Sequence, residues 1–495
     1  MSDLYYSSTR SNEEKLNFSQ AVVRGIAPDG GLYVPSEFPQ VNMEELAKGE
    51  LTYQELAQKV LGLFVKDFSE TEMKDCVYGA YDNKFRTEEI VPLKTCGDAS
   101  FIELYHGKTL AFKDMALSIL PYLLKTAARK LETKEKIVIL TATSGDTGKA
   151  ALEGFADVEG TEILVFYPTD GVSDVQKRQM TTQEGANTHV CGISGNFDDA
   201  QSGVKNIFMN SDFKAALKEK GYVFSSANSI NIGRLVPQIV YYMSSYLKLV
   251  KSNKIQLGDS INVVVPTGNF GNILAAYYAK NMGLPVQKFI CASNKNNVLT
   301  DFIETGVYSL DRAFNTTITP SMDILISSNL ERFLYEISGH DPKCVSGLMN
   351  DLKEKGKYEI SDSMKKNMDA FYGGFVDDDK TIETIKDLYD QYEYVVDTHT
   401  AVGYRVYEDY VKATGDTRHT LIASTASPFK FTRSVVDGIG IDSKSNNDFE
   451  LIDILAEKTG LSVPESIQGL ADRPIYHKTT CEKTEMKKVV EEILK

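Results

Sequence analysis

From about residue 96 onward, short apolar runs rich in strand-forming residues alternate with stretches that have helical apolar spacing. The predicted strands are Lys136–Leu140, Glu162–Tyr167, Thr188–Ile193, Tyr222–Ser225, Asn262–Val265, Lys288–Ala292 and Thr420–Ala423. Several are continuously apolar, as strands buried on both faces must be. The helices predicted between them include Thr147–Ala156, Phe197–Phe208 and Ile273–Met282. This order predicts an α/β fold with a mainly parallel, doubly wound sheet.

Both ends of the chain differ from this middle part. The first 95 residues suggest short elements and helices, with a turn at Gly30-Gly31 before a short strand and a helix pattern over Leu51–Val65. Residues 431–495 have helical spacing and end in a helix rich in Lys and Glu. We therefore expect an N-terminal domain at 1–95, a catalytic α/β core at 96–430 and a C-terminal helical appendage at 431–495.

Composition excludes several classes of protein. Against 54 Lys and Arg stand 69 Asp and Glu, so the net charge is −15 and the basic footprint of a nucleic-acid-binding protein is missing. No apolar run reaches 18 residues, and the N-terminus has no apolar signal segment. The six cysteines are far apart without a C-x-x-C pair, so we expect reduced thiols and no metal site. These features predict a cytoplasmic protein without a nucleic-acid or membrane partner.

Two glycine loops follow a strand and precede a helix, where backbone N–H groups and the positive helix end favour an anion. The first is Thr143-Ser144-Gly145-Asp146-Thr147-Gly148-Lys149. A Walker A motif would need Gly at 143 and Ser or Thr at 150, where the chain has Thr143 and Ala150. A nucleotide-binding P-loop is therefore excluded.

The second loop is Pro266-Thr267-Gly268-Asn269-Phe270-Gly271-Asn272. A dinucleotide G-x-G-x-x-G motif would need glycine where Pro266 stands. Gly268 and Gly271 alone fit an ordinary tight turn equally well. The loop still offers unhindered amides, the Thr267 hydroxyl and two side-chain amides. That set suits one phosphate monoester better than a pyrophosphate.

A single lysine, Lys113, interrupts an apolar stretch at the start of a predicted helix, Asp114–Leu131. Apolar neighbours and the helix dipole both disfavour its charge and lower its pKa, as a Schiff-base lysine requires. The alternative is a surface lysine that extends its amine to solvent. Pro121 is expected to kink this helix or delay its regular start. Hydroxyl residues follow the last predicted strand in Ser424-Thr425-Ala426-Ser427, but alone they also fit a capped turn.

In this order and spacing the segments resemble those of threonine synthases, which are pyridoxal-phosphate enzymes of fold type II related to tryptophan synthase β. The resemblance covers most of the chain and favours the long subclass of fungi and many bacteria. It rests on Arg24–Pro35, His106–Asp114, Ser144–Gly148, Asn228–Asn231 with Arg234, Gly268–Asn272 and Asp397–Gly403.

The resemblance implies that Lys113 forms a Schiff base with pyridoxal 5'-phosphate and later transfers protons. It implies that Thr425 faces the pyridine nitrogen and that Asp146 lies near the phenolic oxygen of the cofactor. The residues implied to hold the cofactor phosphate are Gly268, Asn269, Phe270, Gly271 and Asn272.

Other residues are implied at the substrate. Ser144 and Thr147 would meet its carboxylate, and Asn228, Arg234 and His399 are further candidates, with Arg234 at the substrate phosphate. An ion pair remains the alternative for Arg234, and a structural histidine the alternative for His399.

Two positions depart from the family pattern. The family commonly has His-Pro after the Ser/Thr-Ala near the pyridine site, whereas this chain has Ser427-Pro428. Asp146 stands where related enzymes often have Asn. A carboxylate beside a phenolate oxygen repels it unless it is protonated or turned away.

The implied reaction converts O-phospho-L-homoserine and water to L-threonine and phosphate, the last step of threonine biosynthesis. Two doubly wound lobes are expected, the smaller and mobile one at about 109–215. On the same fold, the rivals are a phospho-lyase and a serine/threonine dehydratase. A non-catalytic anion-binding protein would need no desolvated lysine. We expect a cytoplasmic monomer or weak homodimer with a small-molecule substrate.

Overall fold

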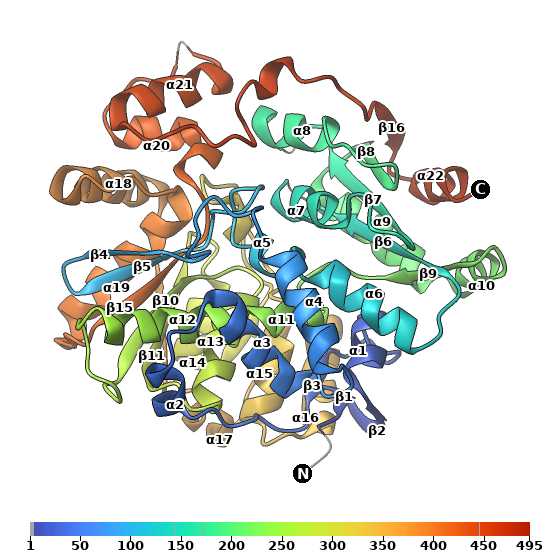
Figure 1. Ribbon diagram of the computed structural model, residues 1–495, viewed down its shortest axis with the longest axis horizontal. Coiled ribbons are helices and arrows are strands. Elements are labelled where there is room, and N and C mark those ends of the chain that lie inside the picture. The colour runs from blue at the N-terminus through green and yellow to red at the C-terminus, as the bar shows by residue number, and fades with distance from the viewer. Residues whose placement is uncertain (1–3, 144, 171, 445) are drawn as a thin grey trace.

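The computed structural model describes residues 4–143, 145–170, 172–444 and 446–495. Two mainly parallel sheets with helices on their faces form two lobes, one on each side of Figure 1. The predicted α/β, doubly wound fold is confirmed. Within the described residues, no helix is long and apolar enough to cross a membrane.

The larger lobe is built on a mixed sheet with a buried centre. In sheet order its strands are β14 (Phe371–Phe375), β11 (Val286–Ser293), β10 (Ile261–Pro266), β15 (Thr420–Ser424), β5 (Ala99–Glu103) and β4 (Leu93–Cys96). Neighbouring strands are parallel except for the β4–β5 pair. Every residue of β10 is buried, and its register places Val264 beside Ile422 of β15. The loops that follow β10 and β15 therefore leave from one edge of the sheet.

Helices cover both faces of this sheet. They are α11 (Ile232–Leu235), α12 (Pro237–Lys251), α13 (Gly271–Asn281), α14 (Val298–Thr305), α18 (Asp378–Tyr392) and α19 (Thr398–Thr414). Between β11 and β14 the chain forms a further set of short elements. These are β12 (Val307–Ser309), η1 (Pro320–Met322), α15 (Leu330–Ile337), α16 (Pro342–Lys355), β13 (Lys357–Glu359) and α17 (Asp362–Lys366).

The smaller lobe has a parallel sheet buried on both faces. In sheet order its strands are β16 (Thr479–Glu482), β8 (Thr188–Ser194), β7 (Thr161–Pro168), β6 (Lys136–Ala142) and β9 (Tyr222–Ser225). Alternate residues of β6 belong to two cores, Ile137 and Ile139 on one face and Val138 and Leu140 on the other. The helices of this lobe are α5 (Asp114–Leu117), α6 (Leu120–Lys130), α7 (Asp146–Phe155), α8 (Asp174–Thr181), α9 (Phe197–Met209), α10 (Ser211–Glu219) and α22 (Met486–Ile493).

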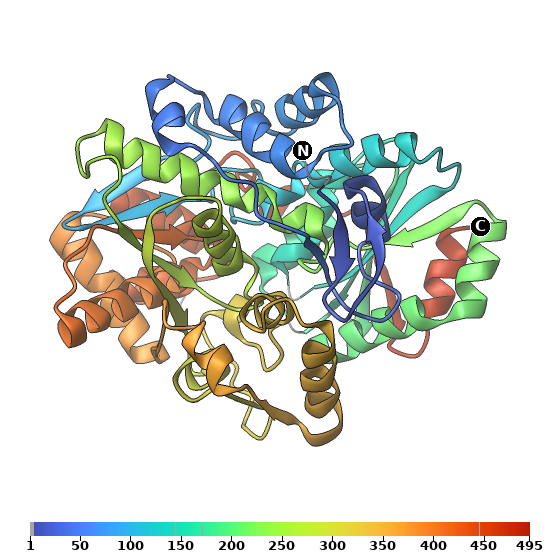
Figure 2. The ribbon, with the colours of Figure 1, turned by 90° about the horizontal axis from the view of Figure 1, so that it is seen from below.

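The N-terminal part lies against both lobes. It contains a small antiparallel sheet of β1 (Tyr6–Ser8), β2 (Ser11–Leu16) and β3 (Tyr33–Pro35), and the helices α1 (Phe18–Arg24), α2 (Met43–Lys48), α3 (Tyr53–Phe64) and α4 (Glu70–Ala80). In Figure 2 its dark-blue strands lie at the junction of the lobes. Arg10 pairs there with Glu331 of α15 at 2.8 Å.

The C-terminal part differs from the helical appendage that the sequence predicts. After η2 (Pro428–Lys430), the helices α20 (Thr432–Gly438) and α21 (Asp448–Thr459) pack beside α18. The chain then passes η3 (Leu470–Asp472) and crosses to the smaller lobe, where β16 joins β8 (Figure 1). β16 has only four residues, and so short a segment shows no periodic pattern that distinguishes a strand from the neighbouring helices.

The seven predicted strands all form, and each observed strand includes the predicted run. Pro121 acts as predicted, because α5 ends at Leu117 and α6 starts afresh at Leu120 with the proline in its first turn. The turn at Gly30-Gly31 leads into β3, and the pattern at Leu51–Val65 forms α3. The sequence analysis does not predict the remaining strands, which are β1, β2, β4, β5, β12, β13, β14 and β16.

Candidate active site

The segment that carries Lys113 is fixed between β15 and α5. Phe112 donates its backbone N–H to the Thr425 carbonyl at 2.8 Å, and Ala111 forms an antiparallel bridge with Ala426. On the other side, Asp114 accepts the Thr109 N–H at 2.8 Å and the Thr109 hydroxyl. Burial raises the pKa of Asp114 to about 6, against the opposing effect of these hydrogen bonds. The end of β15 thus holds the lysine segment by its backbone.

Lys113 lies in a buried environment, with its side chain 11% exposed. Its Nζ is 3.3 Å from Asp146 Oδ2. Burial lowers the pKa of Lys113, Asp146 opposes that effect, and the positive charges of Lys430 and Arg234 add to it. The net result is a pKa below the ordinary lysine value, so the surface-lysine alternative is wrong.

Asp146 starts α7 and joins the two lobes. Its Oδ1 accepts from Gln176 at 2.9 Å and pairs with Lys430 Nζ at 3.0 Å, while its Oδ2 also accepts from the Ser321 hydroxyl at 3.2 Å. Burial raises the pKa of Asp146, but Lys430 and Lys113 lower it by more than burial raises it. The net pKa therefore lies well below the ordinary range of an aspartate. The carboxylate is therefore ionised and compensated by lysines. These contacts favour the ionised carboxylate over the protonated form that the sequence also allows.

The first glycine loop is shaped by Thr143. The Thr143 hydroxyl accepts the N–H groups of Gly145 and Gly148, each at 2.9 Å. A Cβ on Gly148 would lie 2.4 Å from the Thr143 methyl group, so the loop depends on glycine there. Thr147 is half-buried beside Asp146 at the start of α7. Ser144, the other candidate in this loop, lies outside the described residues.

The second glycine loop leads from β10 into α13. Phe270 has a left-handed φ of 61°, and the first backbone bond of the helix runs from Leu274 N–H to Phe270 O. The N–H groups of Gly271, Asn272 and Ile273 precede it and have no acceptor within the helix. On the opposite side, the carbonyls of the loop are bound, Gly268 O by the Ser327 hydroxyl at 2.8 Å and Asn269 O by Asn329 N–H at 3.1 Å. The loop thus offers amide donors at a helix start.

Beside this loop, the side-chain NH2 groups of two buried asparagines have no hydrogen-bond acceptor among the described residues. Asn272 Oδ1 accepts from Tyr241 at 2.9 Å and from Tyr242, and its Nδ2 has no partner among the described residues. Asn329 Oδ1 accepts from Arg332, and its buried Nδ2 is likewise unpaired there. Unpaired buried donors are costly, so both nitrogens fit an anionic ligand such as a phosphate group. The residues present therefore fit a phosphate-bearing cofactor.

Arg234 is also buried, at 3% exposure. It donates to Ala227 O at 2.7 Å, and its Nε has no partner among the described residues. None of the carboxylates in the described residues pairs with it, so the ion pair that the sequence also allows is not found there. Burial lowers its pKa to about 10. A buried guanidinium without a counterion is stabilised when an anion binds.

His399 lies in a hydrogen-bonded chain that reaches the site through Ser321. Its Nδ1 is 2.8 Å from Asp397 Oδ2, and its Nε2 accepts the Ser321 N–H at 3.2 Å. Asp397 caps α19 by accepting from the His399 and Thr400 N–H groups. With both ring nitrogens engaged, His399 has the contacts of a structural histidine that positions Ser321.

Sequence reasoning missed the residues that tie these segments together: Gln176, Ser321, Asn329 and Lys430. Ser321 bonds to Asp146 and His399, and its carbonyl lies 2.4 Å from where a Cβ on Gly268 would be. These residues come from loops and short elements with no periodic pattern. Of these four residues, only Lys430 could have been suspected from the sequence, because it follows Ser424, the last residue of β15, by six positions.

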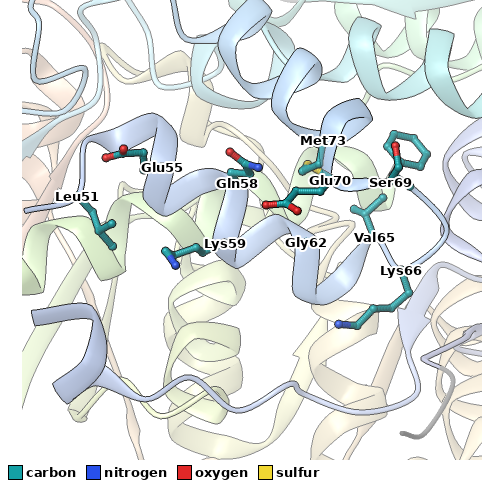
Figure 3. Close-up of a pocket in the computed structure, with 11 residues that line it drawn as sticks. Leu51, Glu55, Gln58, Lys59, Gly62, Val65, Lys66, Ser69, Glu70 and Met73 are labelled. Atoms are coloured by element: carbon teal, nitrogen blue, oxygen red, sulfur yellow. The ribbon is translucent and has the colours of Figure 1, made fainter. Parts of the chain in front are cut away.

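A separate cavity of about 420 Å³ lies between α3 and α4 (Figure 3). Its lining includes Glu55, Gln58, Lys59 and Glu70, and none of its lining residues is a candidate active-site residue. Among the described residues, no cluster of His, Cys, Asp or Glu is arranged to hold a metal ion.

Three family models match the chain in succession. "Threonine synthase N terminus" matches residues 5–81, "Pyridoxal-phosphate dependent enzyme" matches 101–425, and "Threonine synthase, C-terminal" matches 400–493. The threonine synthase of Pseudomonas aeruginosa is 39% identical over 440 residues, which cover 88% of this chain and 90% of that protein. The chain belongs to the threonine synthase family. The Schizosaccharomyces pombe enzyme of this family is 35% identical, with 93% of this chain and 94% of that protein covered.

Solved structures of threonine synthases agree with this membership. The pyridoxal-phosphate-bound protein from Brucella melitensis is 35% identical, with a TM-score of 0.88 and 99% of both chains covered. The yeast protein is 31% identical, with a TM-score of 0.86, 99% of this chain and 98% of that chain covered. "Threonine synthase-like 1" of Homo sapiens is 40% identical over 437 residues, 86% of this chain. The chain spans only 58% of the length of that human relative.

Proposed function

We propose that the chain is a pyridoxal-phosphate-dependent lyase that converts O-phospho-L-homoserine and water to L-threonine and phosphate. One observation carries the proposal: the buried Lys113 amine, with its lowered pKa, is connected to two features that attract anions. One is Arg234, whose charge acts on Lys113 and whose Nε has no partner among the described residues. The other is the loop at the start of α13, which Ser321 links to Asp146 and so to Lys113. A substrate with one phosphate and a cofactor with another match that set.

Lys113 would bind the cofactor through its amine, which is nucleophilic only without its proton. The backbone N–H groups of Gly268–Asn272 and the Asn272 amide would hold the cofactor phosphate. Thr425 would face the pyridine nitrogen. Support for Thr425 comes from its neighbour, because the Ser424 hydroxyl is already bonded to Thr400 at 3.1 Å. When bound, pyridoxal phosphate withdraws electrons from Cα of an amino acid.

The substrate would be held by its two anionic groups. Thr147, at the start of α7, and Ser144 would bind the carboxylate. Asn228 and Arg234 would bind the phosphate, with Arg234 as the charged partner. A guanidinium whose Nε has no described partner keeps a donor available for a phosphate oxygen. His399 would act only through Ser321.

Proton transfer is assigned to Lys113. In its neutral form, Nζ accepts the proton from Cα of the substrate. Loss of a proton from Cβ then expels the phosphate from Cγ, and Arg234 stabilises the charge of the departing phosphate. The buried surroundings of Lys113 keep water from the reacting carbon until the phosphate has left. Cγ is then protonated, water adds its OH at Cβ and Cα regains a proton, which separates a synthase from a simple phospho-lyase.

The test is an assay of the purified chain with pyridoxal phosphate and O-phospho-L-homoserine. Equal release of phosphate and threonine supports the proposal, and the Lys113→Ala variant should release neither. Phosphate with a 2-oxo acid in place of threonine would indicate a phospho-lyase. A 2-oxo acid from serine or threonine without phosphate would indicate a dehydratase. A folded chain that turns over none of these substrates would overturn the enzymatic proposal.

Three further expectations belong to this proposal. The chain would act in the cytoplasm as a monomer or weak homodimer. Its parts would be divided at about residues 95 and 430, although the C-terminal family model begins at residue 400. The segment at 109–215 would move as a lobe.

A further inference from the structure

Lys430 is a buried lysine that the proposed reaction does not use. It ends η2, just after β15, and its side chain is 1% exposed. Its Nζ donates to Thr109 O at 2.7 Å and pairs with Asp146 Oδ1 at 3.0 Å. Burying a lysine costs free energy unless its charge is compensated, so the Asp146 contact accounts for its position.

Asp146 is therefore shared by two amines. Lys430 lies on Oδ1, and Lys113 lies on Oδ2 at the longer distance of 3.3 Å. Gln176 and Ser321 donate to the same carboxylate from α8 and η1. One negative charge faces two buried ammonium groups, and it can compensate only one of them.

The other charges near Lys113 favour the same outcome. Arg234 adds a positive charge from α11. Asp114 faces Lys430 from α5, but its two oxygens are bound to Thr109. Lys430 has the shorter ion pair and a carbonyl acceptor as well, so Lys430 engages the Asp146 carboxylate more closely than Lys113 does.

We propose that Lys430 is a positioning residue that takes the negative charge of Asp146 and so keeps the Lys113 amine neutral. This inference rests on the proposed role of Lys113 as the cofactor lysine. A purely structural Lys430 would only tie η2 to the lysine segment through Thr109 O.

The experiment measures the titration of Lys113 in the full-length chain freed of cofactor. Competitive acylation over a range of pH, followed by mass spectrometry, gives a midpoint and a plateau rate for this amine. Lys430→Gln should raise the midpoint by about one pH unit or more, because Lys113 gains sole use of Asp146 and loses a repelling charge. Lys430→Arg should restore the low midpoint. Asp146→Asn should lower the midpoint below that of the wild type.

Lys248→Gln is the matched control, because Lys248 is a partly buried lysine of α12 whose amine, like that of Lys430, contacts a carboxylate, Glu89 at 2.8 Å, and a carbonyl, Val91 O. It should leave the midpoint unchanged. A variant that makes Lys113 more accessible to the reagent would raise the plateau rate of acylation. Loss of the Lys430 charge should change only the midpoint pH of the titration. Thermal unfolding of each variant checks that it is folded.

Two outcomes separate this inference from the function it rests on. An ordinary lysine midpoint in the wild type would remove the basis for Lys113 as the cofactor lysine. A low wild-type midpoint that Lys430→Gln does not shift would overturn the role of Lys430 alone. If Lys430→Gln unfolds, Asp146→Asn decides, since a midpoint that rises or stays unchanged there also overturns the proposal.

Discussion

At the residue scale, burial and the Asp146 carboxylate act in opposite directions on the pKa of the Lys113 amine. Burial and two nearby cations lower its pKa, and Asp146 raises it, with burial the largest effect. Burial raises the pKa of the same carboxylate, and the charge of Lys430 does most to lower it. The site thus places the amine of Lys113 beside the negative charge of Asp146.

Lys113→Ala is expected to abolish the visible absorbance of bound cofactor and the turnover, while the protein stays folded. The variant removes a buried amine that burial already disfavours, so thermal stability should not fall markedly. Absorbance spectra, circular dichroism and the phosphate-release assay measure the three effects. A variant that keeps both colour and activity would show that another residue binds the cofactor.

The hydroxyls at the end of β15 differ in their partners, and this allows a direct comparison. Ser424 is bonded to Thr400, whereas Thr425 lies in the backbone contact with the lysine segment. Thr425→Asp should hold a proton on the pyridine nitrogen by charge pairing and increase abortive formation of pyridoxamine phosphate. Chromatography of the released cofactor measures it. If only Ser424→Asp has this effect, the residue that faces the pyridine nitrogen is Ser424 and not Thr425.

At the element scale, the second glycine loop is held from outside as well as from within. Asn329 and Ser327 bind its carbonyls, and Ser321 lies against Gly268. A Cβ on Gly268 would lie 2.4 Å from the backbone oxygen of Ser321, whereas one on Gly271 would lie 3.4 Å from Asn329 Nδ2. The two glycines therefore have different reasons to be glycine.

The two glycine variants should separate fold stability from cofactor affinity. Gly268→Ala must displace backbone and should lower both the melting temperature and the affinity for pyridoxal phosphate. Gly271→Ala should keep the melting temperature close to that of the wild type, because its Cβ would meet Asn329 Nδ2 at 3.4 Å, an ordinary contact distance. Gly271→Val should reduce affinity at nearly unchanged stability. Equal cofactor retention after dialysis in all variants would contradict the phosphate role of the loop.

The C-terminal elements complete the core of the smaller lobe. Met486 of α22 is 1% exposed and packs with β6, β7 and α9. Met486→Ala should lower the free energy of unfolding by about 2–4 kcal/mol, the usual cost of a large cavity. Met209, at the end of α9, is 74% exposed and provides the control. Denaturant unfolding of both variants measures the difference, and equal stabilities would mean that α22 is not part of this core.

At the scale of the whole molecule, Asp146 and the C-terminal chain both connect the two lobes. Asp146 of the smaller lobe pairs with Lys430, and the N–H groups of Tyr476 and His477 both bond to Thr181 O of α8. The predicted lobe at 109–215 shares its sheet with β9 and β16, which lie outside that range. Any motion must therefore include β16 and α22.

Closure of the lobes is expected to exclude water while the phosphate leaves. Hydrogen exchange in the presence of a substrate analogue should slow at the start of α7 and along α8. Protease sensitivity of the chain between α21 and β16 should fall at the same time. Identical exchange and proteolysis with and without the analogue would contradict closure.

The sequence alone determined the parallel strands, the two glycine loops and the choice of Lys113 as the candidate Schiff-base lysine. These depend on local pattern: continuous apolar runs, glycine between strand and helix, and one lysine in an apolar helix start. Tertiary structure decided the rest. It brought Ser321 and Lys430 to Asp146 from positions 175 and 284 residues away, left Arg234 without a carboxylate among the described residues, and gave β16 to the smaller lobe. Such contacts depend on which loops leave the same edge of a sheet, which no local spacing encodes.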